Sequence, residues 1–141
     1  MARLPICLIL INDVMRRVLI VLVAIFCVAA TWAQPKSAKL SFERESHDFG
    51  RVLRSKGDVS VEFRFTNEGT APLVVKKATT TCSCTTVEFS KKPIMPGKQG
   101  TIRIIYSPNK LPAETFHKAI KVFSNDPRGM QIITIHGESV D

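Results

Sequence analysis

The stretch VSVEFRF, residues 59–65, decides the fold class of this chain. Its apolar side chains stand at every second position and alternate with serine, glutamate and arginine. Successive side chains of a β-strand point to opposite faces, so this alternation predicts a strand with one buried face and one solvated face. We expect Phe63 and Phe65 to lie at the centre of the core, with Glu62 and Arg64 on the solvent face.

The chain on either side of this strand continues the same pattern. Period-two segments follow one another, and turn signals rich in Gly, Pro and Asn recur roughly every eight to twelve residues. No window after residue 40 shows a helical period of useful length. The pattern predicts an all-β fold, a β-sandwich of about seven strands. The expected segments are 40–53 (an opening edge segment), 59–65, 73–79, 85–89, 101–106, 116–123 and 130–136, with a six-residue loop at 124–129 between the last two.

The N-terminal segment has the order of a secretory signal peptide. Arg16 and Arg17 precede thirteen uncharged residues, VLIVLVAIFCVAA, and the small residues Thr31 and Ala33 follow. We expect residues 1–33 to be the signal peptide, with Met15 as an alternative start, 34–39 a linker and 40–141 the domain. An uncleaved anchor is the alternative, although the apolar run is shorter than the roughly 20 residues of a spanning helix.

Export to the periplasm or the cell surface follows from this interpretation, and contact with the membrane is expected only through an uncleaved signal. Cys27 lies at the end of the apolar run, where lipid-modified cysteines occur. The bulky Phe26 before it argues against lipid attachment, which needs a small residue at that position.

The charge pattern indicates a solvated surface. The net charge is +8, and it falls to about +6 once residues 1–33, with three arginines and one aspartate, are removed. The cations are scattered singly along the predicted strands, apart from Lys76-Lys77 and Lys91-Lys92. A dispersed pattern of this kind is typical of a solvated face, so no nucleic-acid partner is expected.

Cys82-Ser83-Cys84 is the one motif with a chemistry to weigh. In a regular strand the two thiols would stand side by side, too far apart for a disulfide, so a bridge needs a local kink. Four interpretations remain open: a structural disulfide or buried pair, a redox or intermolecular bridge, half a site for a soft ion such as Cu(I) or Zn(II), and no special role.

No motif for catalysis or for a cofactor appears in the chain. The sequence lacks a nucleophile elbow G-x-S-x-G, a phosphate-binding G-x-x-x-x-G-K and the zinc motif H-E-x-x-H. His47, His117 and His136 do not stand at a ligand spacing from the cysteines, and we interpret them as surface or satisfied sandwich residues. We therefore expect no enzyme, no cofactor and no metal ligands beyond the weak candidates Cys82 and Cys84.

The order of several segments also resembles a known family. The segments are HDFGRV, VEFRFTNEGTAPLVV, TTCSCT, IMPGKQG, TIRIIYSP, KVFSND and a final IHG. Over residues 40–137 the chain resembles the bacterial domain of unknown function 1573, and more distantly the sandwich domains of major sperm protein and Hydin-like ciliary proteins. The resemblance implies an exported, immunoglobulin-like β-sandwich without an assigned function. The family has glycine between the two cysteines where this chain has Ser83, which weakens the case for a positive-φ turn there.

The functional expectation is a non-catalytic, exported binding or assembly module of the cell envelope. Sandwich domains of this kind mostly act as binding modules, and exposed sheet edges suit partners that add a strand. The expected partner is a protein or a glycan of the envelope. The rival function is a thiol-dependent redox or soft-metal-handling protein that uses Cys82 and Cys84.

We predict that the exported protein begins at Gln34, because Thr31 and Ala33 supply small side chains at the third and first positions before the cut. N-terminal sequencing of exported material measures this directly. A start before Val18, or a full-length chain extracted from membranes, would overturn the signal-peptide interpretation.

Overall fold

The computed structural model describes residues 6–30 and 35–141. Two separate units make up the chain: the first contains the helix α1 (Ile6–Ala30), and the second, Lys36–Asp141, is an all-β domain. Within the described residues, no helix has the length and apolarity needed to cross a membrane. The predicted cut between Ala33 and Gln34 lies outside the described residues.

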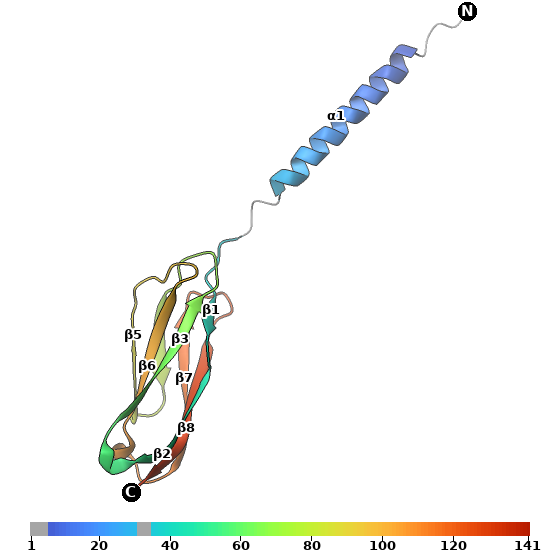
Figure 1. Ribbon diagram of the computed structural model, residues 1–141. Coiled ribbons are helices and arrows are strands. Elements are labelled where there is room, and N and C mark those ends of the chain that lie inside the picture. Colours follow the sequence, from blue (N-terminus) through green and yellow to red (C-terminus); the bar gives the residue numbers. More distant parts are fainter. Residues whose placement is uncertain (1–5, 31–34) are drawn as a thin grey trace, which may run out of the picture. The chain divides into compact units, whose positions relative to one another are not determined.

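The domain is a sandwich of two four-stranded sheets, shown in Figure 1. The first sheet has the strand order β1-β3-β6-β5 and the second has the order β2-β8-β7-β4. Most neighbouring strands are antiparallel, and the β2–β8 pair is parallel. The elements are β1 (Leu40–Phe42), β2 (Ser46–Leu53), the short 3₁₀-helix η1 (Arg54–Lys56), β3 (Val59–Asn67), β4 (Val75–Thr80), β5 (Thr85–Phe89), β6 (Gln99–Tyr106), η2 (Pro108–Lys110), β7 (Thr115–Ser124) and β8 (Gln131–Val140).

The core lies between the two sheets and follows the predicted alternation. Phe63 and Phe65 of β3 are 0% and 1% exposed, whereas Glu62 and Arg64 point to solvent. From the second sheet Phe116 reaches across and stacks on Tyr106, with the ring centroids 4.0 Å apart. Isoleucines and valines from the inner faces of β6, β7 and β8 complete the core: Ile102, Ile104, Ile120, Val122, Ile133 and Ile135.

The predicted opening segment 40–53 is divided between the two sheets. β1 pairs antiparallel with β3, the chain changes sheet between Phe42 and Ser46, and β2 pairs parallel with β8. The period of two is the same in both halves, and it carries no information about which distant strand each half joins. The division explains why the sandwich has eight strands where the sequence indicated about seven.

The fourth strand begins later than the sequence predicts. Leu73 forms only an isolated bridge to Ile94, and β4 starts at Val75. Between them the Val74 N–H donates to Oδ1 of Asn125 at 2.8 Å, and the Val74 carbonyl accepts from the Asn125 N–H. These two bonds hold Val74 to the loop after β7, so the apolar run LVV does not enter the ladder as a whole.

A buried carboxylate joins the two sheets. The Asp126 side chain, 1% exposed in the loop between β7 and β8, accepts a hydrogen bond from the Leu40 N–H of β1 at 2.7 Å. Arg128 binds the same carboxylate, and its Nη2 also donates to the Leu40 carbonyl at 2.6 Å. Gln131 Nε2 donates to that carbonyl too, at 2.9 Å. The hydrogen bonds from Arg128 outweigh the effect of burial and lower the pKa of Asp126 to about 2.

Truncating Phe63 should test the register of β3. We expect Phe63→Ala to lower the free energy of unfolding by about 3–5 kcal/mol, because it leaves a cavity between the sheets. Arg64→Ala, one residue further on the solvent face, should change the free energy by no more than about 0.5 kcal/mol. Urea titrations of both variants measure the contrast. Equal losses of stability in the two variants would mean that the register assigned to β3 is wrong.

The Asp126 carboxylate should give the domain a specific acid sensitivity. Its pKa is lower in the folded protein than its ordinary value of 3.8, so its stabilisation is present above about pH 4 and is lost as the pH falls towards 2. This lowering of the pKa corresponds to about 2 kcal/mol in the free energy of unfolding. Chemical denaturation of wild type and Asp126→Asn between pH 7 and 2 measures it. The wild type should lose more stability on acidification, and the control Asp58→Asn, at an exposed position, should behave like the wild type.

Candidate functional site

The cysteine motif forms the corner where the chain passes from the second sheet to the first. β4 ends at Thr80 and β5 begins at Thr85, so the motif lies outside both strands. Cys82 and Cys84 form a disulfide with their Cα atoms 5.1 Å apart. Two strand rises would separate them by roughly 6.6 Å, so the backbone is kinked here. The Thr85 N–H donates to the Cys82 carbonyl at 3.2 Å and closes this turn.

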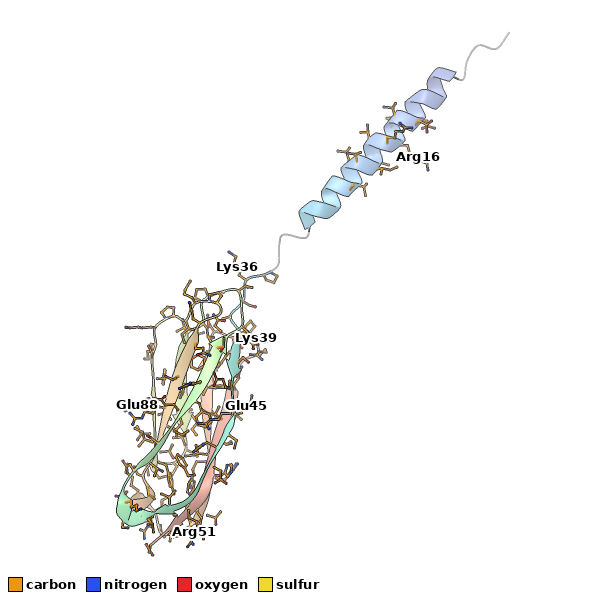
Figure 2. The ribbon with its side chains drawn as sticks, viewed as in Figure 1. Arg16, Lys36, Lys39, Glu45, Arg51 and Glu88 are labelled. Atoms are coloured by element: carbon orange, nitrogen blue, oxygen red, sulfur yellow. A yellow bond between two sulfur atoms is a disulfide. The ribbon has the colours of Figure 1, made fainter. Side chains whose placement is uncertain are left out.

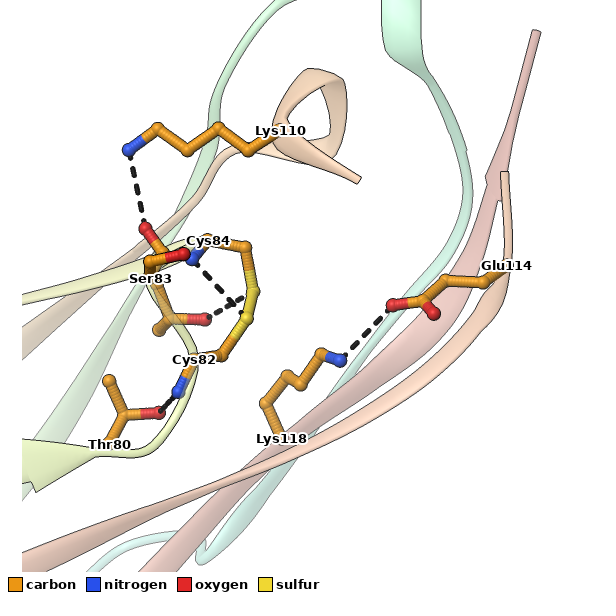
Figure 3. Close-up of a disulfide and its surroundings, with 8 residues drawn as sticks. Thr80, Cys82, Ser83, Cys84, Lys110, Glu114 and Lys118 are labelled. Carbon is orange, nitrogen blue, oxygen red and sulfur yellow. Dashed lines mark hydrogen bonds and ion pairs between the residues drawn. A yellow bond between two sulfur atoms is a disulfide. The ribbon is translucent and has the colours of Figure 1, made fainter. Parts of the chain in front are cut away.

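Hydrogen bonds from neighbouring segments hold the corner, as Figure 3 shows. Lys110 Nζ of η2 donates to the Ser83 carbonyl at 3.3 Å, and the Cys82 N–H donates to Thr80 Oγ1 at 3.4 Å. Ser83 has no positive φ, since all positive-φ residues among those described are glycines. The turn therefore forms with serine at this position and needs no glycine.

The two sulfur atoms differ in their surroundings. Cys84 is 1% exposed and belongs to the core, whereas Cys82 is only partly buried. The Cys84 N–H lies 3.2 Å from Cys82 Sγ and donates to it. In the disulfide form neither sulfur is a thiolate, which is the form that binds metal ions or attacks as a nucleophile. The soft-metal interpretation of the motif therefore requires prior reduction.

β5, which follows the corner, is an edge strand of the first sheet. The Ser107 N–H donates to the Cys84 carbonyl at 2.8 Å, so these two residues face each other as a hydrogen-bonded pair at the start of the β5–β6 ladder. Pairs of an antiparallel ladder alternate between bonded and non-bonded. Thr86 and Glu88 therefore bond to β6, and the N–H and C=O groups of the residues between them point away from it.

Val87 and Phe89 consequently present their backbone groups at the free edge of β5. The pairing of β6 with β3 agrees with this assignment. The hydrogen bond from the Asn67 N–H to the Lys98 carbonyl (3.0 Å) fixes which β6 residues bond to β3, and the alternate residues of β6 bond to β5. The side chains of Val87 and Phe89 pack against the core. The strand is regular over its whole length, so the free groups form an ordered row.

The other three edges are less open. The backbone groups of Leu40 in β1 are taken by Asp126, Arg128 and Gln131. β2 contains an irregularity between Asp48 and Arg51, and β4 contains one between Val75 and Lys77. Irregular pairing and lysines are devices that protect an edge from further strands. Among the described strands, β5 is the edge best suited to accept another strand.

A second group of polar residues lies on the outer face of the second sheet. Asp48 of β2 stands opposite His136 of β8, and His136 stands opposite His117 of β7. We call these three the histidine row. His136 Nδ1 lies 3.3 Å from Ser46 Oγ, and its Nε2 lies 3.7 Å from Asp48 Oδ2. The row lines an open pocket of about 530 Å³.

The histidine row was missed from the sequence. His117 and His136 lie equally far from the middle of the loop 124–129, so the predicted hairpin already implied that they face each other. Asp48 could not be placed beside them, because β2 joins β8 from a distant part of the chain. His47, by contrast, packs its ring on Phe49 with centroids 4.7 Å apart. Burial, followed by the charge of Arg44, lowers the pKa of His47.

The contacts of His136 with a serine and an aspartate do not make a catalytic triad. A nucleophile, base and orienting group need hydrogen bonds of roughly 2.6–3.2 Å. Asp48 Oδ2 lies 3.7 Å from His136 Nε2, and the two side chains are 62% and 40% exposed. The arrangement lacks the buried carboxylate that would orient the imidazole, so it gives no support for nucleophilic catalysis.

Comparisons with known proteins agree with this fold. No curated protein matches the chain. A protein of unknown function from Porphyromonas gingivalis W83 shares the fold with a TM-score of 0.63 and 23% identity; the match covers 75% of this chain and spans about half (48%) of that protein. The PapD-like domain 7 of human CEP192 has a TM-score of 0.62 and 11% identity, over 77% of this chain and 90% of that domain. The YadV chaperone has a TM-score of 0.54 and 16% identity, over 72% and 52% of the two chains.

The family comparison covers nearly the whole sandwich. The model of the family described as "Protein of unknown function (DUF1573)" matches residues 40–139, from the first residue of β1 almost to the end of β8. The likeness to the solved structures establishes the same PapD-like and immunoglobulin-like sandwich for these residues. The chain therefore belongs to the DUF1573 family of proteins of unknown function.

Proposed function

We propose that this domain is a non-catalytic, exported binding module of the cell envelope that takes up an extended segment of a partner protein along β5. The observation that carries the proposal is the free backbone row at Val87 and Phe89. Each added backbone hydrogen bond contributes about 0.5–1.5 kcal/mol net, so a strand that fills this row gains a modest but ordered set of contacts.

The chemistry of the edge favours a polypeptide over a glycan. Alternating N–H and C=O groups at a fixed spacing match those of another β-strand. One of the proteins that share this fold is a chaperone, which is a class that binds polypeptides. A glycan offers hydroxyl groups without this spacing, and we keep it as an outcome of the test.

The side chains around the edge indicate which segment would fit. Glu88 points outward from β5 (Figure 2), and its Oε2 lies 3.9 Å from Nη1 of Arg103 in the neighbouring strand β6. A strand added on the free side of β5 would bring one of its own residues beside Glu88, where a lysine or arginine is favourable. On the inner face the segment would meet Val87 and Phe89. The partner segment should therefore alternate apolar with polar residues and carry a cation.

Export is part of the proposal. The cationic start, the short apolar run and the small residues before Gln34 support a signal peptide of residues 1–33. The Cys82–Cys84 disulfide suits a compartment outside the reducing cytosol. Both observations support a periplasmic or cell-surface location.

Hydrogen exchange should reveal the free edge in the isolated protein. We expect the amides of Val87 and Phe89 to exchange much faster than those of Thr86 and Glu88, because only the latter pair donates to β6. Residue-resolved exchange followed by NMR measures the alternation. Uniform protection along β5, or the opposite alternation, would remove the basis of the proposal.

Binding through β5 should depend on one backbone N–H. We expect Val87→Pro to abolish partner capture while the domain stays folded, because proline removes a donor that the ladder does not use. Ala78→Pro is the matched control: the β7–β8 register places its N–H on the free edge of β4. A photo-crosslinking residue at position 88 of the exported chain reports capture in the native envelope.

Two results would contradict this proposal. One is an undiminished protein crosslink in Val87→Pro, which would mean that the partner does not pair with β5; an accompanying loss in Ala78→Pro would move the site to β4. The other is a crosslinked product that consists of glycan. Circular dichroism and a melting curve of each variant establish that it is folded before the comparison is made.

The rival function is thiol exchange at the corner, and a specific contact favours it. The hydrogen bond from the Cys84 N–H to Cys82 Sγ would stabilise a thiolate at the more exposed cysteine. Reduction by a partner dithiol would yield the two thiols here and a disulfide in the partner. The double variant Cys82→Ser/Cys84→Ser separates the two functions. If β5 is the binding site, this variant should keep partner capture. If thiol exchange is the function, the variant should lose partner capture completely.

A further inference from the structure

We propose that the histidine row, Asp48, His136 and His117, is a binding site for a divalent transition-metal ion such as Zn²⁺. The three residues come from β2, β8 and β7, which are consecutive strands of the second sheet. Each stands directly opposite the next in the register, so the three side chains project in one line across the outer face. Two imidazoles and one carboxylate form a donor set that suits zinc.

Hydrogen bonds already orient two of the three ligands. The Gly50 N–H donates to Asp48 Oδ1 at 2.7 Å, which leaves Oδ2 directed towards His136. Ser46 Oγ lies 3.3 Å from Nδ1 of His136, on the side of the ring away from Asp48. A metal-binding histidine normally uses its second ring nitrogen in this way, which fixes the orientation of the ring.

The backbone around the row is shaped to bring these residues together. β2 is irregular between Asp48 and Arg51, where Gly50 has a φ of 62°. Gly137, next to His136, lies so close to the Gly50 carbonyl that a Cβ atom there would be 2.7 Å from its oxygen. Gly137 thus allows β2 to approach β8 beside the histidine, and Gly50 adopts the left-handed conformation at the irregularity of β2.

The distances allow an ion without movement of the strands. Zinc bonds to imidazole nitrogen and carboxylate oxygen are each about 2.0–2.2 Å long, so an ion fits between atoms that are 3.7 Å apart. The His117 and His136 ring centroids are 6.0 Å apart. In the described residues no three His, Cys, Asp or Glu side chains already converge on one point. The exposed His117 ring would therefore turn about its side-chain bonds to complete the site.

The charges around the row leave room for a cation. Arg51, the cation that lines the same pocket, is paired with Glu138 at 3.7 Å. The competing interpretation is that Asp48 and His136 form only a surface ion pair, which would contribute about 0–1 kcal/mol and need no third residue. That interpretation gives no role to His117, so variants of His117 distinguish the two.

Calorimetric titration of the purified exported protein with Zn²⁺ tests the proposal. The protein should carry no histidine tag and should be kept without reductant, so that Cys82 and Cys84 stay joined. We expect one ion per chain and a zinc-dependent rise in melting temperature. His136→Gln and His117→Gln should each weaken binding by at least tenfold. Ser46→Ala, which removes only the orienting contact, should weaken it by about tenfold.

His47→Gln is the matched control, because His47 belongs to the same strand as Asp48 but packs on Phe49. It should leave zinc affinity within about twofold of the wild type. NMR signals of the His117 and His136 rings should shift on titration, while those of His47 should stay. Absence of binding at millimolar zinc, or equal losses in His47→Gln and His117→Gln, would overturn the proposal. The site is on the opposite sheet from β5, so its failure would leave the proposed binding function untouched.

Discussion

The buried carboxylate of Asp126 is the interaction on which the arrangement of the strands depends. A charge with 1% exposed side-chain surface is tolerable only because Arg128 and the Leu40 N–H surround it. The same group of residues supplies partners to both backbone groups of Leu40, which is the first residue of β1. A short strand of three residues would otherwise be held by little more than its pairing with β3. Asp126 therefore fixes where the chain enters the sandwich.

This entry point determines which side of the sandwich is closed. The chain changes sheet five times, and two of these changes join edge strands directly: β1 to β2 on one side of the sandwich and β4 to β5 on the other, so each side has its own corner. On the first side Asp126, Arg128 and Gln131 use the backbone groups of Leu40, so these groups cannot bind an added strand. On the second side the Cys82–Cys84 bridge fixes only the turn, and the edge of β5 beyond it stays open. The proposed binding site therefore lies on the β5 side of the sandwich, because the two corners leave different backbone groups free.

The local pattern of the sequence was sufficient for the fold class and the core, because alternation is a property of neighbouring residues. Phe63 and Phe65 are buried and Arg64 is exposed, as the period of two requires. The pairing of strands is not local, and there the sequence was less informative. Nothing in residues 40–53 indicates that the first half joins β3 and the second half β8. The histidine row depends on that same distant pairing, and for this reason Asp48 was missed.

The histidine row contributes little to the folded state as an apoprotein. The Asp48–His136 pair is largely exposed, and exposed ion pairs contribute between nothing and about 1 kcal/mol. His117 and His136 face each other across β7 and β8, with their ring centroids 6.0 Å apart. Packing does not require either ring, since both project from the outer face. A bound cation would join the two rings, because both imidazoles would then donate a nitrogen lone pair to the same ion. The row therefore adds little to the stability of the fold, and the proposed ion would give its three side chains a common role.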